Sequence, residues 1–352
     1  MRRIRFRAVL SILLLLAASL GLFKTVTAQS VTVVAVGDIC LANGVETAMR
    51  ERGRGYPFNA LKSTMRNADI VFGNLECCMA TGGKKVEKKY NFRGHPRGAL
   101  ALKEAGFHLI SLANNHSLDF GKPALAETLG YLRQQGITAV GAGRTMREAR
   151  RLHIVNKNGL RIGFLAYLGL YPSVVKLTAN QPAVAMADLG PLKREIREAR
   201  KRVDFLLVSL HAGKEYTFIH TPRQAEIAHT AIDAGADMVI GHHPHVVQDI
   251  ENYRGKQIFY SLGNFVFNPS PTFLKDQGRR WSAMVVARLE KGQPAEAEMV
   301  DLRIVDRQPG FADTAAAQTA SRYIRVGDTI GSAAPPAYLK PAPAPALKTH
   351  QR

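Results

Sequence analysis

Short apolar runs that alternate with helical stretches constrain the fold of this chain more than any other feature of its sequence. Four runs rich in β-branched residues, each closed by Gly or Asn, predict strands at residues 31–36, 68–72, 107–112 and 137–140. Stretches at 96–105 and 122–135 predict helices between them. This alternation is typical of βα units, so we expect an α/β fold around a largely parallel, buried sheet.

The second half of the chain continues the pattern after a hairpin. An Asn-Gly turn at 156–159 separates strands predicted at 152–155 and 160–166. Further helices are predicted at 189–202 and 223–234, and further strands at 205–210, 237–240 and 258–262. Two late apolar runs, at 282–289 and 297–305, indicate an antiparallel pair.

The two ends of the chain differ from this central part. Arginines within residues 2–7, an uncharged apolar stretch at 8–23 and a Val-Thr-Ala segment at 26–28 indicate a signal peptide at 1–28. We expect export to the periplasm or cell surface, and an uncleaved leader would anchor the protein in the membrane. The Pro- and Ala-rich sequence from Ala333 predicts a partly disordered tail within 311–352, which leaves 29–310 as the folded domain.

The chain is strongly basic, with a formal net charge of +20. An exported basic protein favours anionic polymers, anionic lipid headgroups or phosphorylated substrates as partners. A generally basic surface that serves solubility is the alternative. The basic residues are scattered and no nucleic-acid-binding module accompanies them, so we expect no nucleic-acid partner.

The chain has three cysteines, Cys40, Cys77 and Cys78, and all of them follow predicted strands. An oxidising compartment permits a disulfide between Cys40 and either of the other two. Buried free thiols are the alternative.

The residues that follow the predicted strands carry the chemistry of the chain. In open α/β sheets, sites form beyond the carboxyl ends of the strands. Five of the 11 histidines fall at three strand ends, together with carboxylates and amides. The full set is Asp38, Asn74, Glu76, Asn114, Asn115, His116, His211, His242, His243, His245 and Asn264. This mixture of oxygen and nitrogen donors predicts a site for Zn, Mn or Fe rather than a thiolate site.

Two of these histidines flank a proline, in His243-Pro244-His245. On an extended segment, residues two apart point to the same side, so we expect both imidazoles to face one site.

The same residues resemble a known family in ordered motifs. These are Gly37-Asp38, Asn74-Leu75-Glu76, Ala113-Asn114-Asn115-His116, Gly141-Ala142-Gly143, His211-Ala212-Gly213, Gly241-His242-His243-Pro244-His245 and Tyr260-Ser261-Leu262-Gly263-Asn264-Phe265. Together they are similar to the CapA family, which is linked to poly-γ-glutamate capsule synthesis. The resemblance spans residues 31–267. It implies the α/β/β/α four-layer sandwich of calcineurin-like metallophosphoesterases, which hold two divalent metal ions.

The resemblance also implies roles for individual residues. Asp38 would bind the first metal together with His245, and Asn115, His211 and His243 would bind the second. Glu76, or alternatively Asn74, would replace the bridging carboxylate. His116 would be the general acid.

Other roles remain open between two interpretations. Asp119 would orient His116 or cap the following helix. We assign Asn114, His242, Glu215 and Asn264 to substrate binding. For Glu215 the alternative is an ordinary loop residue, and for Asn264 it is a cap of the Gly263 turn.

Two departures from the usual phosphoesterase pattern bear on catalysis. Cys40 stands where these enzymes have a histidine, and Asn74-Leu75-Glu76 stands where they have an Asp. The first metal would be weakly held, held with the Cys40 thiolate, or absent. One hypothesis is therefore a metal-dependent hydrolase of a phosphoester or of an amide in a γ-glutamyl polymer. The other is a non-catalytic protein that binds an anionic polymer for membrane-associated capsule synthesis machinery.

Overall fold

The computed structural model describes residues 29–170, 176–268 and 280–322. The predicted signal peptide and the Pro-rich part of the predicted tail lie outside these residues. No helix within the described ranges is both long enough and apolar enough to cross a membrane.

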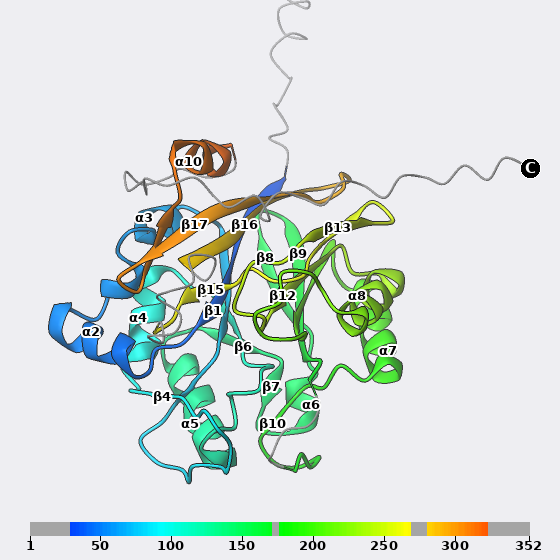
Figure 1. Cartoon of the computed structure of the whole chain (residues 1–352). Coiled ribbons are helices and arrows are strands. Elements are labelled where there is room, and N and C mark those ends of the chain that lie inside the picture. The colour runs from blue at the N-terminus through cyan, green and yellow to red at the C-terminus, as the bar shows by residue number, and fades with distance from the viewer. Residues whose placement is uncertain (1–28, 171–175, 269–279, 323–352) are drawn as a thin grey trace, which may run out of the picture.

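Two β-sheets form the centre of the molecule (Figure 1). The first sheet has the order β18 (Gln308–Phe311), β17 (Glu296–Val305), β16 (Trp281–Glu290), β1 (Ser30–Ile39), β2 (Ile70–Leu75), β5 (Leu109–Ser111) and β6 (Thr138–Val140), and β15 (Asn264–Val266) pairs with β1. The strands β1, β2, β5, β6 and β15 run parallel, whereas β16 to β18 are antiparallel.

The second sheet has the order β13 (Ile250–Tyr253), β14 (Lys256–Phe259), β12 (Met238–His242), β11 (Phe205–His211), β9 (Leu160–Leu168) and β8 (His153–Lys157). Its central strands β9, β11, β12 and β14 are parallel. The hairpin β8–β9 and the antiparallel pair β16–β17 confirm the two pairings predicted from the sequence. Two short pairs complete the strands: β3 (Cys78–Met79) with β4 (Arg93–Gly94), and β7 (Ala142–Gly143) with β10 (Ala183–Val184).

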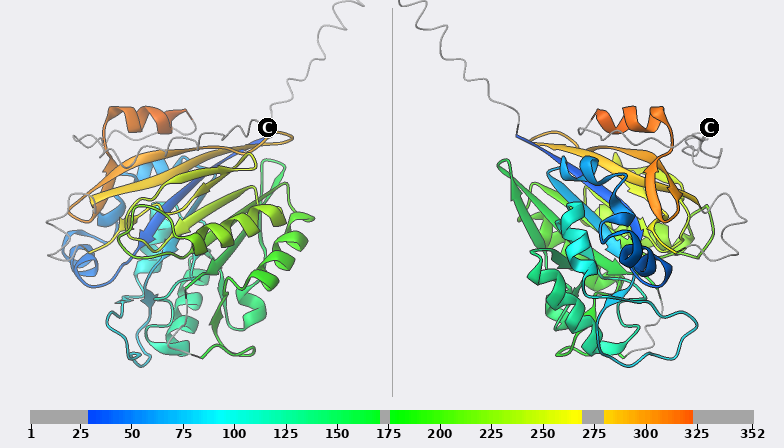
Figure 2. Two further views of the ribbon diagram at one scale, coloured as in Figure 1. Left: turned by 45° about the vertical axis from the view of Figure 1, so that its right-hand side comes forward. Right: turned by 90° about the vertical axis from the view of Figure 1, so that its left-hand side faces the viewer.

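Helices cover both outer faces of the paired sheets (Figure 2). On the side of the first sheet lie α2 (Gly44–Arg52), the 3-10 turn η1 (Tyr56–Phe58), α3 (Lys62–Arg66), α4 (Gly98–Ala105) and α5 (Gly121–Gln134). On the side of the second sheet lie α7 (Leu189–Arg200) and α8 (Pro222–Ala234), while the short α6 (Met146–Ala149) joins the two halves. The result is an α/β/β/α four-layer sandwich, as the resemblance implied.

Apolar side chains hold these layers together. Phe72 on β2 stacks against Phe164 on β9 with ring centroids 5.7 Å apart, so the two sheets share one core. A second core lies between the second sheet and its helices, where Val208 on β11 packs with Ile196 on α7 and Ile227 on α8. Burying such side chains stabilises the fold by about 1.5–3 kcal/mol each.

One helix begins inside the segment predicted as tail. In α10 (Thr314–Ser321), the Asp313 carboxylate accepts a hydrogen bond from Ala316 N, which caps the first turn. The helix packs against β17 and β18 through the buried Ala316 and Ala320.

Candidate metal centre

The parallel strands of both sheets end at one edge of the sandwich, where the polar residues gather. Asp38 lies near the end of β1, next to Asn74 on β2 and Asn264 on β15 in the strand register. His211 ends β11 and pairs with His242 at the end of β12. The first sheet therefore contributes carboxylates to this edge, and the second contributes imidazoles.

Two glycines let neighbouring backbones approach closely beside these residues. A Cβ atom at Gly37 would lie 2.0 Å from the carbonyl oxygen of Gly263, and one at Gly241 would lie 2.0 Å from that of Tyr260. Neither distance is possible for a real side chain, so only glycine fits directly before Asp38 and His242.

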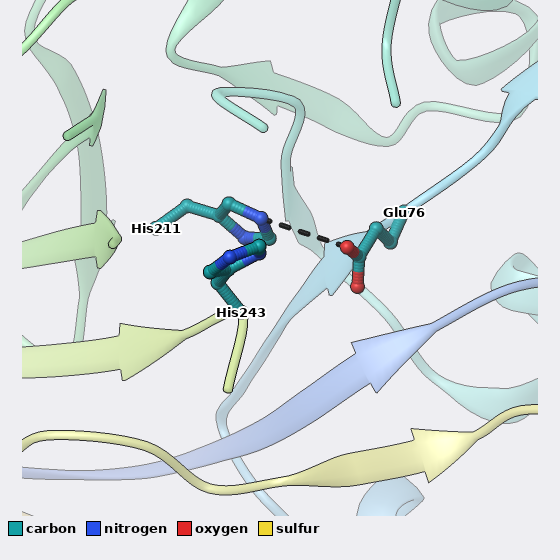
Figure 3. Close-up of side chains that lie close together, drawn as sticks. All are labelled: Glu76, His211 and His243. Carbon is teal, nitrogen blue, oxygen red and sulfur yellow. Dashed lines mark ion pairs between the residues drawn. The ribbon is translucent and has the colours of Figure 1, made fainter. Parts of the chain in front are cut away.

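Three overlapping groups of side chains have ligand atoms close enough to hold a cation. Within each group the ligand atoms lie within 4.8 Å of one another. The groups are Glu76 with His211 and His243, Asp38 with Glu76 and His245, and Glu215 with His243 and His245. Glu76 is common to the first two groups, and Figure 3 shows its carboxylate facing the rings of His211 and His243.

Glu76 is the residue whose surroundings most clearly call for a cation. Its side chain is fully buried, and neither carboxylate oxygen has a hydrogen-bond partner among the described residues. Its Oε1 lies 3.6 Å from His211 Nε2 and 3.8 Å from His245 Nε2. A buried carboxylate without a partner is costly, and a divalent cation would offset that cost. Oxygen and imidazole donors of this kind fit Zn, Mn or Fe.

Burial also sets the charge of the cluster. It raises the pKa of Asp38 to about 7, against hydrogen bonds that favour the carboxylate, and it raises the pKa of Glu76, as does the nearby charge of Asp38. Burial lowers the pKa of His211 and, with His245 nearby, lowers the pKa of His243 to about 3. The imidazoles of His211 and His243 therefore favour the neutral state, which is the state that binds metals.

The ligand side chains are fixed by neighbouring amides. Asn74 Nδ2 donates to Asp38 Oδ1 at 2.8 Å, and Asn264 Oδ1 lies 2.9 Å from His245 Nδ1. Asn115 Oδ1 lies 2.9 Å from His211 Nε2, which places it at the edge of the cluster. Such partners fix the orientation of ligating imidazoles.

His116 stands beside this cluster and forms a pair with Asp119. Its Nδ1 lies 2.7 Å from Asp119 Oδ2, and its Nε2 lies 3.9 Å from Glu76 Oε1. Phe92 N also donates to Asp119 Oδ2, at 2.7 Å. Of the two interpretations of Asp119, this geometry supports orientation of His116, because α5 begins after Phe120 with no side-chain cap.

One further residue at this place, Lys88, could not be singled out from the sequence. Its Nζ forms an ion pair with Asp119, donates to the Asn115 carbonyl at 2.8 Å and lies 3.2 Å from His116 Nδ1. Lys88 belongs to an irregular segment with three other lysines, and nothing in the local sequence separates it from them. Only the fold shows which lysine points inward.

Three residues predicted to bind substrate have other places in the structure. His242 is fully buried, with its ring nitrogens near Ser209 Oγ and the Val36 carbonyl, so it belongs to the core. The Asn114 side chain is held by Asn74, Leu75, His116 and Ser117. Asn264 supports His245, as described above. In contrast, Glu215 is exposed at the mouth of the cluster and joins one of the three groups of possible ligands.

The segment His243–His245 is also bent rather than extended. His243 has φ 100° and His245 has φ 60°, backbone angles that residues other than glycine rarely adopt. The two rings still approach each other, with centroids 5.9 Å apart. Strained backbone of this kind is typical of functional sites.

The three cysteines are buried free thiols. Burial raises the pKa of Cys40 well above its usual range, and its thiol is hydrogen bonded with Cys77. Cys40 belongs to none of the three groups of possible ligands.

Two packed sheets with helices on both outer faces, and a carboxylate–histidine cluster where the strands of both sheets end, define an α/β/β/α sandwich protein with a candidate metal centre. The family model for the bacterial capsule synthesis protein PGA_cap matches residues 32–269, and the chain belongs to this family. The predicted CapA resemblance is thereby confirmed.

Named relatives agree with this assignment. The chain is 32% identical over 289 residues to the capsule biosynthesis protein CapA of Bacillus anthracis, covering 80% of this chain and 69% of the relative. It is also 32% identical over 289 residues to the PGA biosynthesis protein CapA of Bacillus subtilis, covering 81% and 75%. A hypothetical protein from Thermus thermophilus shares the fold, with a TM-score of 0.50, 20% identity and coverage of 78% of this chain and 100% of that one.

Proposed function

We propose that this protein is an exported, metal-dependent hydrolase of capsule or poly-γ-glutamate biosynthesis. One observation carries the proposal: Glu76 is buried without a partner between imidazoles of the second sheet, an arrangement that fits a divalent cation. The family and the names of the two CapA relatives support the biological setting. Its substrate class is a phosphoester, or an amide of a γ-glutamyl polymer.

The ligands divide between two cation positions. Glu76, His211 and His243, with the Asn115 oxygen at the edge, would hold one cation, and Asp38, Glu76 and His245 would hold the other. When bound, divalent cations of the Mn, Zn or Fe type supply Lewis-acid polarisation of the scissile group.

His116 has the geometry of a proton donor to the leaving atom. The Asp119 carboxylate accepts a hydrogen bond from His116 Nδ1–H, which leaves Nε2 facing the cluster. Lys88 holds the same carboxylate from its other oxygen and fixes the loop through the Asn115 carbonyl. Phe92 packs on the His116 ring with centroids 4.4 Å apart, which limits access of water to one side. The chain thus orients one imidazole and keeps its Nε2 available for proton transfer.

The decisive experiment combines metal content with turnover of the mature chain. We expect Mn, Zn or Fe to co-purify, and we expect hydrolysis in a screen of phosphoesters and γ-glutamyl amides. His116→Gln should lower kcat by about 10²-fold or more while the metal content stays unchanged. Turnover that survives both chelation and this substitution would sink the proposal.

A non-catalytic binding protein is the second candidate, and Cys40 favours it. This thiol lies where a phosphoesterase has a metal-binding histidine, so one cation position has a single imidazole. A protein of this kind would hold an anionic polymer for membrane-associated synthesis machinery. It would keep its polymer affinity in the His116→Gln variant and show no turnover in any form.

A further inference from the structure

A cavity with a basic wall lies apart from the candidate metal centre. A cavity of about 490 Å³ is bordered by α5, β6, β7, α6 and the start of β8, elements that Figure 1 labels. Its wall includes Arg133, Arg144, Arg151 and His153, and none of its lining residues belongs to the candidate cation groups. Cavities of this size are typical of small-ligand sites.

The charge of this cavity is unbalanced. Arg150, which directly follows α6, is paired with Glu195 at 3.0 Å and with Asp188 at 3.5 Å. Within the described residues, by contrast, Arg133, Arg144 and Arg151 form no ion pair. One acid, Glu148, lines the cavity, and its Oε2 accepts a hydrogen bond from Arg144 N at 2.9 Å. Three arginines without an ion pair thus line the cavity together with one carboxylate that already has a backbone donor.

The remaining wall supplies uncharged groups. His153 Nε2 is buried and has no hydrogen-bond partner among the described residues. Thr138 and Ala139 belong to β6, which is the end strand of the first sheet and therefore has a sheet neighbour on one side only. A ligand with both carboxylates and amides would match this wall, with its carboxylates at the arginines and its amides at the edge of β6.

The arginines come from three separate segments, because Arg133 lies on α5, Arg144 precedes α6 and Arg151 follows it. Guanidinium groups match carboxylates in a two-pronged geometry, and a spread of them suits an anion with several separated charges. The volume exceeds what one small anion needs. We propose that this cavity is an anion-binding site, which takes a segment of a polycarboxylate chain and does not require the metal centre to be catalytic.

Calorimetric titration of the mature chain with a synthetic γ-linked glutamate oligomer tests this proposal at fixed, low salt. The test variant carries Arg133→Gln, Arg144→Gln and Arg151→Gln. The matched control carries Lys193→Gln, Arg194→Gln and Arg197→Gln on the exposed face of α7, which removes the same number of charges elsewhere. Melting curves check that each variant folds, and single Arg144→Gln and Arg151→Gln variants serve if the triple variant does not.

We expect the test variant to bind about tenfold or more weakly and the control to stay within about threefold of the natural chain. Equal losses in both variants would show a general basic surface and overturn the site. No binding by the natural chain, or binding lost only on His211→Ala, would overturn it as well. If inorganic phosphate binds with the same arginine dependence and the oligomer does not, the ligand is a single anion and the polycarboxylate assignment is wrong.

Discussion

Replacing Glu76 by glutamine tests the proposed centre at its most sensitive residue. Glutamine keeps the size of the side chain and removes its charge. Because Glu76 belongs to two of the three candidate ligand groups, the change weakens both cation positions at once. In the metal-free protein the substitution should not lower the stability, since the natural carboxylate is buried there without a hydrogen-bond partner. We therefore expect a variant that metal no longer stabilises and that is at least as stable as the natural chain without metal.

The size of the effect follows from binding linkage. A cation at one hundred times its Kd stabilises the folded state by about 2.7 kcal/mol. Losing a group that merely supports a metal ligand costs up to about 100-fold in affinity, so we take about 100-fold as the minimum for Glu76 itself. At the same cation concentration, about 0.4 kcal/mol of stabilisation would remain. The difference of about 2 kcal/mol corresponds to a Tm shift of about 4 °C in a folded domain of about 280 residues, because the entropy of unfolding is about 2.1 cal/mol/K per residue.

The assay is a thermal melt of chelator-treated protein with and without added MnCl₂. The natural chain should gain the full shift, and Glu76→Gln should gain about 1 °C or less. Glu215→Gln is the matched control, because Glu215 is exposed and belongs to one group only, so it should keep most of the shift. An equal metal-dependent shift in the natural chain and in Glu76→Gln would refute the central place of this carboxylate.

Individual contacts lead to three more expected outcomes. Lys88→Gln should lower turnover about tenfold at unchanged metal content, because Lys88 holds Asp119 and the Asn115 carbonyl. The control variant Lys85→Gln should keep the natural rate. Equal rates for the two variants in a steady-state assay would contradict this role of Lys88. Gly241→Ala should destabilise the fold by about 3 kcal/mol in urea unfolding, since the added Cβ would meet the Tyr260 carbonyl. The control variant Gly130→Ala, in open space on α5, should be neutral or stabilising. Similar free energies of unfolding for both variants would count against the close approach at Gly241. Burial lowers the pKa of His153 from 6.5 to about 4, so the unfolded chain takes up a proton first as the pH falls. The free energy of unfolding should therefore drop by up to about 3 kcal/mol between pH 6.5 and 4. His153→Gln should flatten this fall in urea titrations at several pH values, and an unchanged pH dependence in the variant would disprove the role of His153.

Sequence reasoning located the strands well because buried parallel strands leave a clear signal. Runs such as 205–210 are continuous, apolar and short, and the structure has β11 there. The rule that sites form beyond the carboxyl ends of strands then assigned Asp38, His211 and His243 to one edge of the molecule. Short helices such as α3, which has 5 residues, carry no comparable periodic signal and were not predicted.

The direction of each side chain at a strand end could not be read from the sequence. His242 and His243 are adjacent, yet His242 ends β12 with its ring in the core, whereas His243 lies in the bend that follows the strand and belongs to the ligand cluster. Asn114 and Asn115 divide in the same way. The bend at His243–His245 depends on positive φ angles, which the residue types of this segment do not predict. Lys88 reaches the site only through the path of an irregular segment.

The division of ligands between the sheets explains how the fold tolerates such a costly cluster. Asp38 and Glu76 come from the first sheet, whereas His211, His243 and His245 come from the second. A cation held by Glu76 and His211 would therefore bridge the two sheets at the one edge where polar groups replace the apolar core. Without it, burial raises the pKa of both carboxyl groups, and the charge of Asp38 raises the pKa of Glu76 further. If the proposed centre binds a cation, we therefore expect that cation to stabilise the packing of the two sheets at this edge.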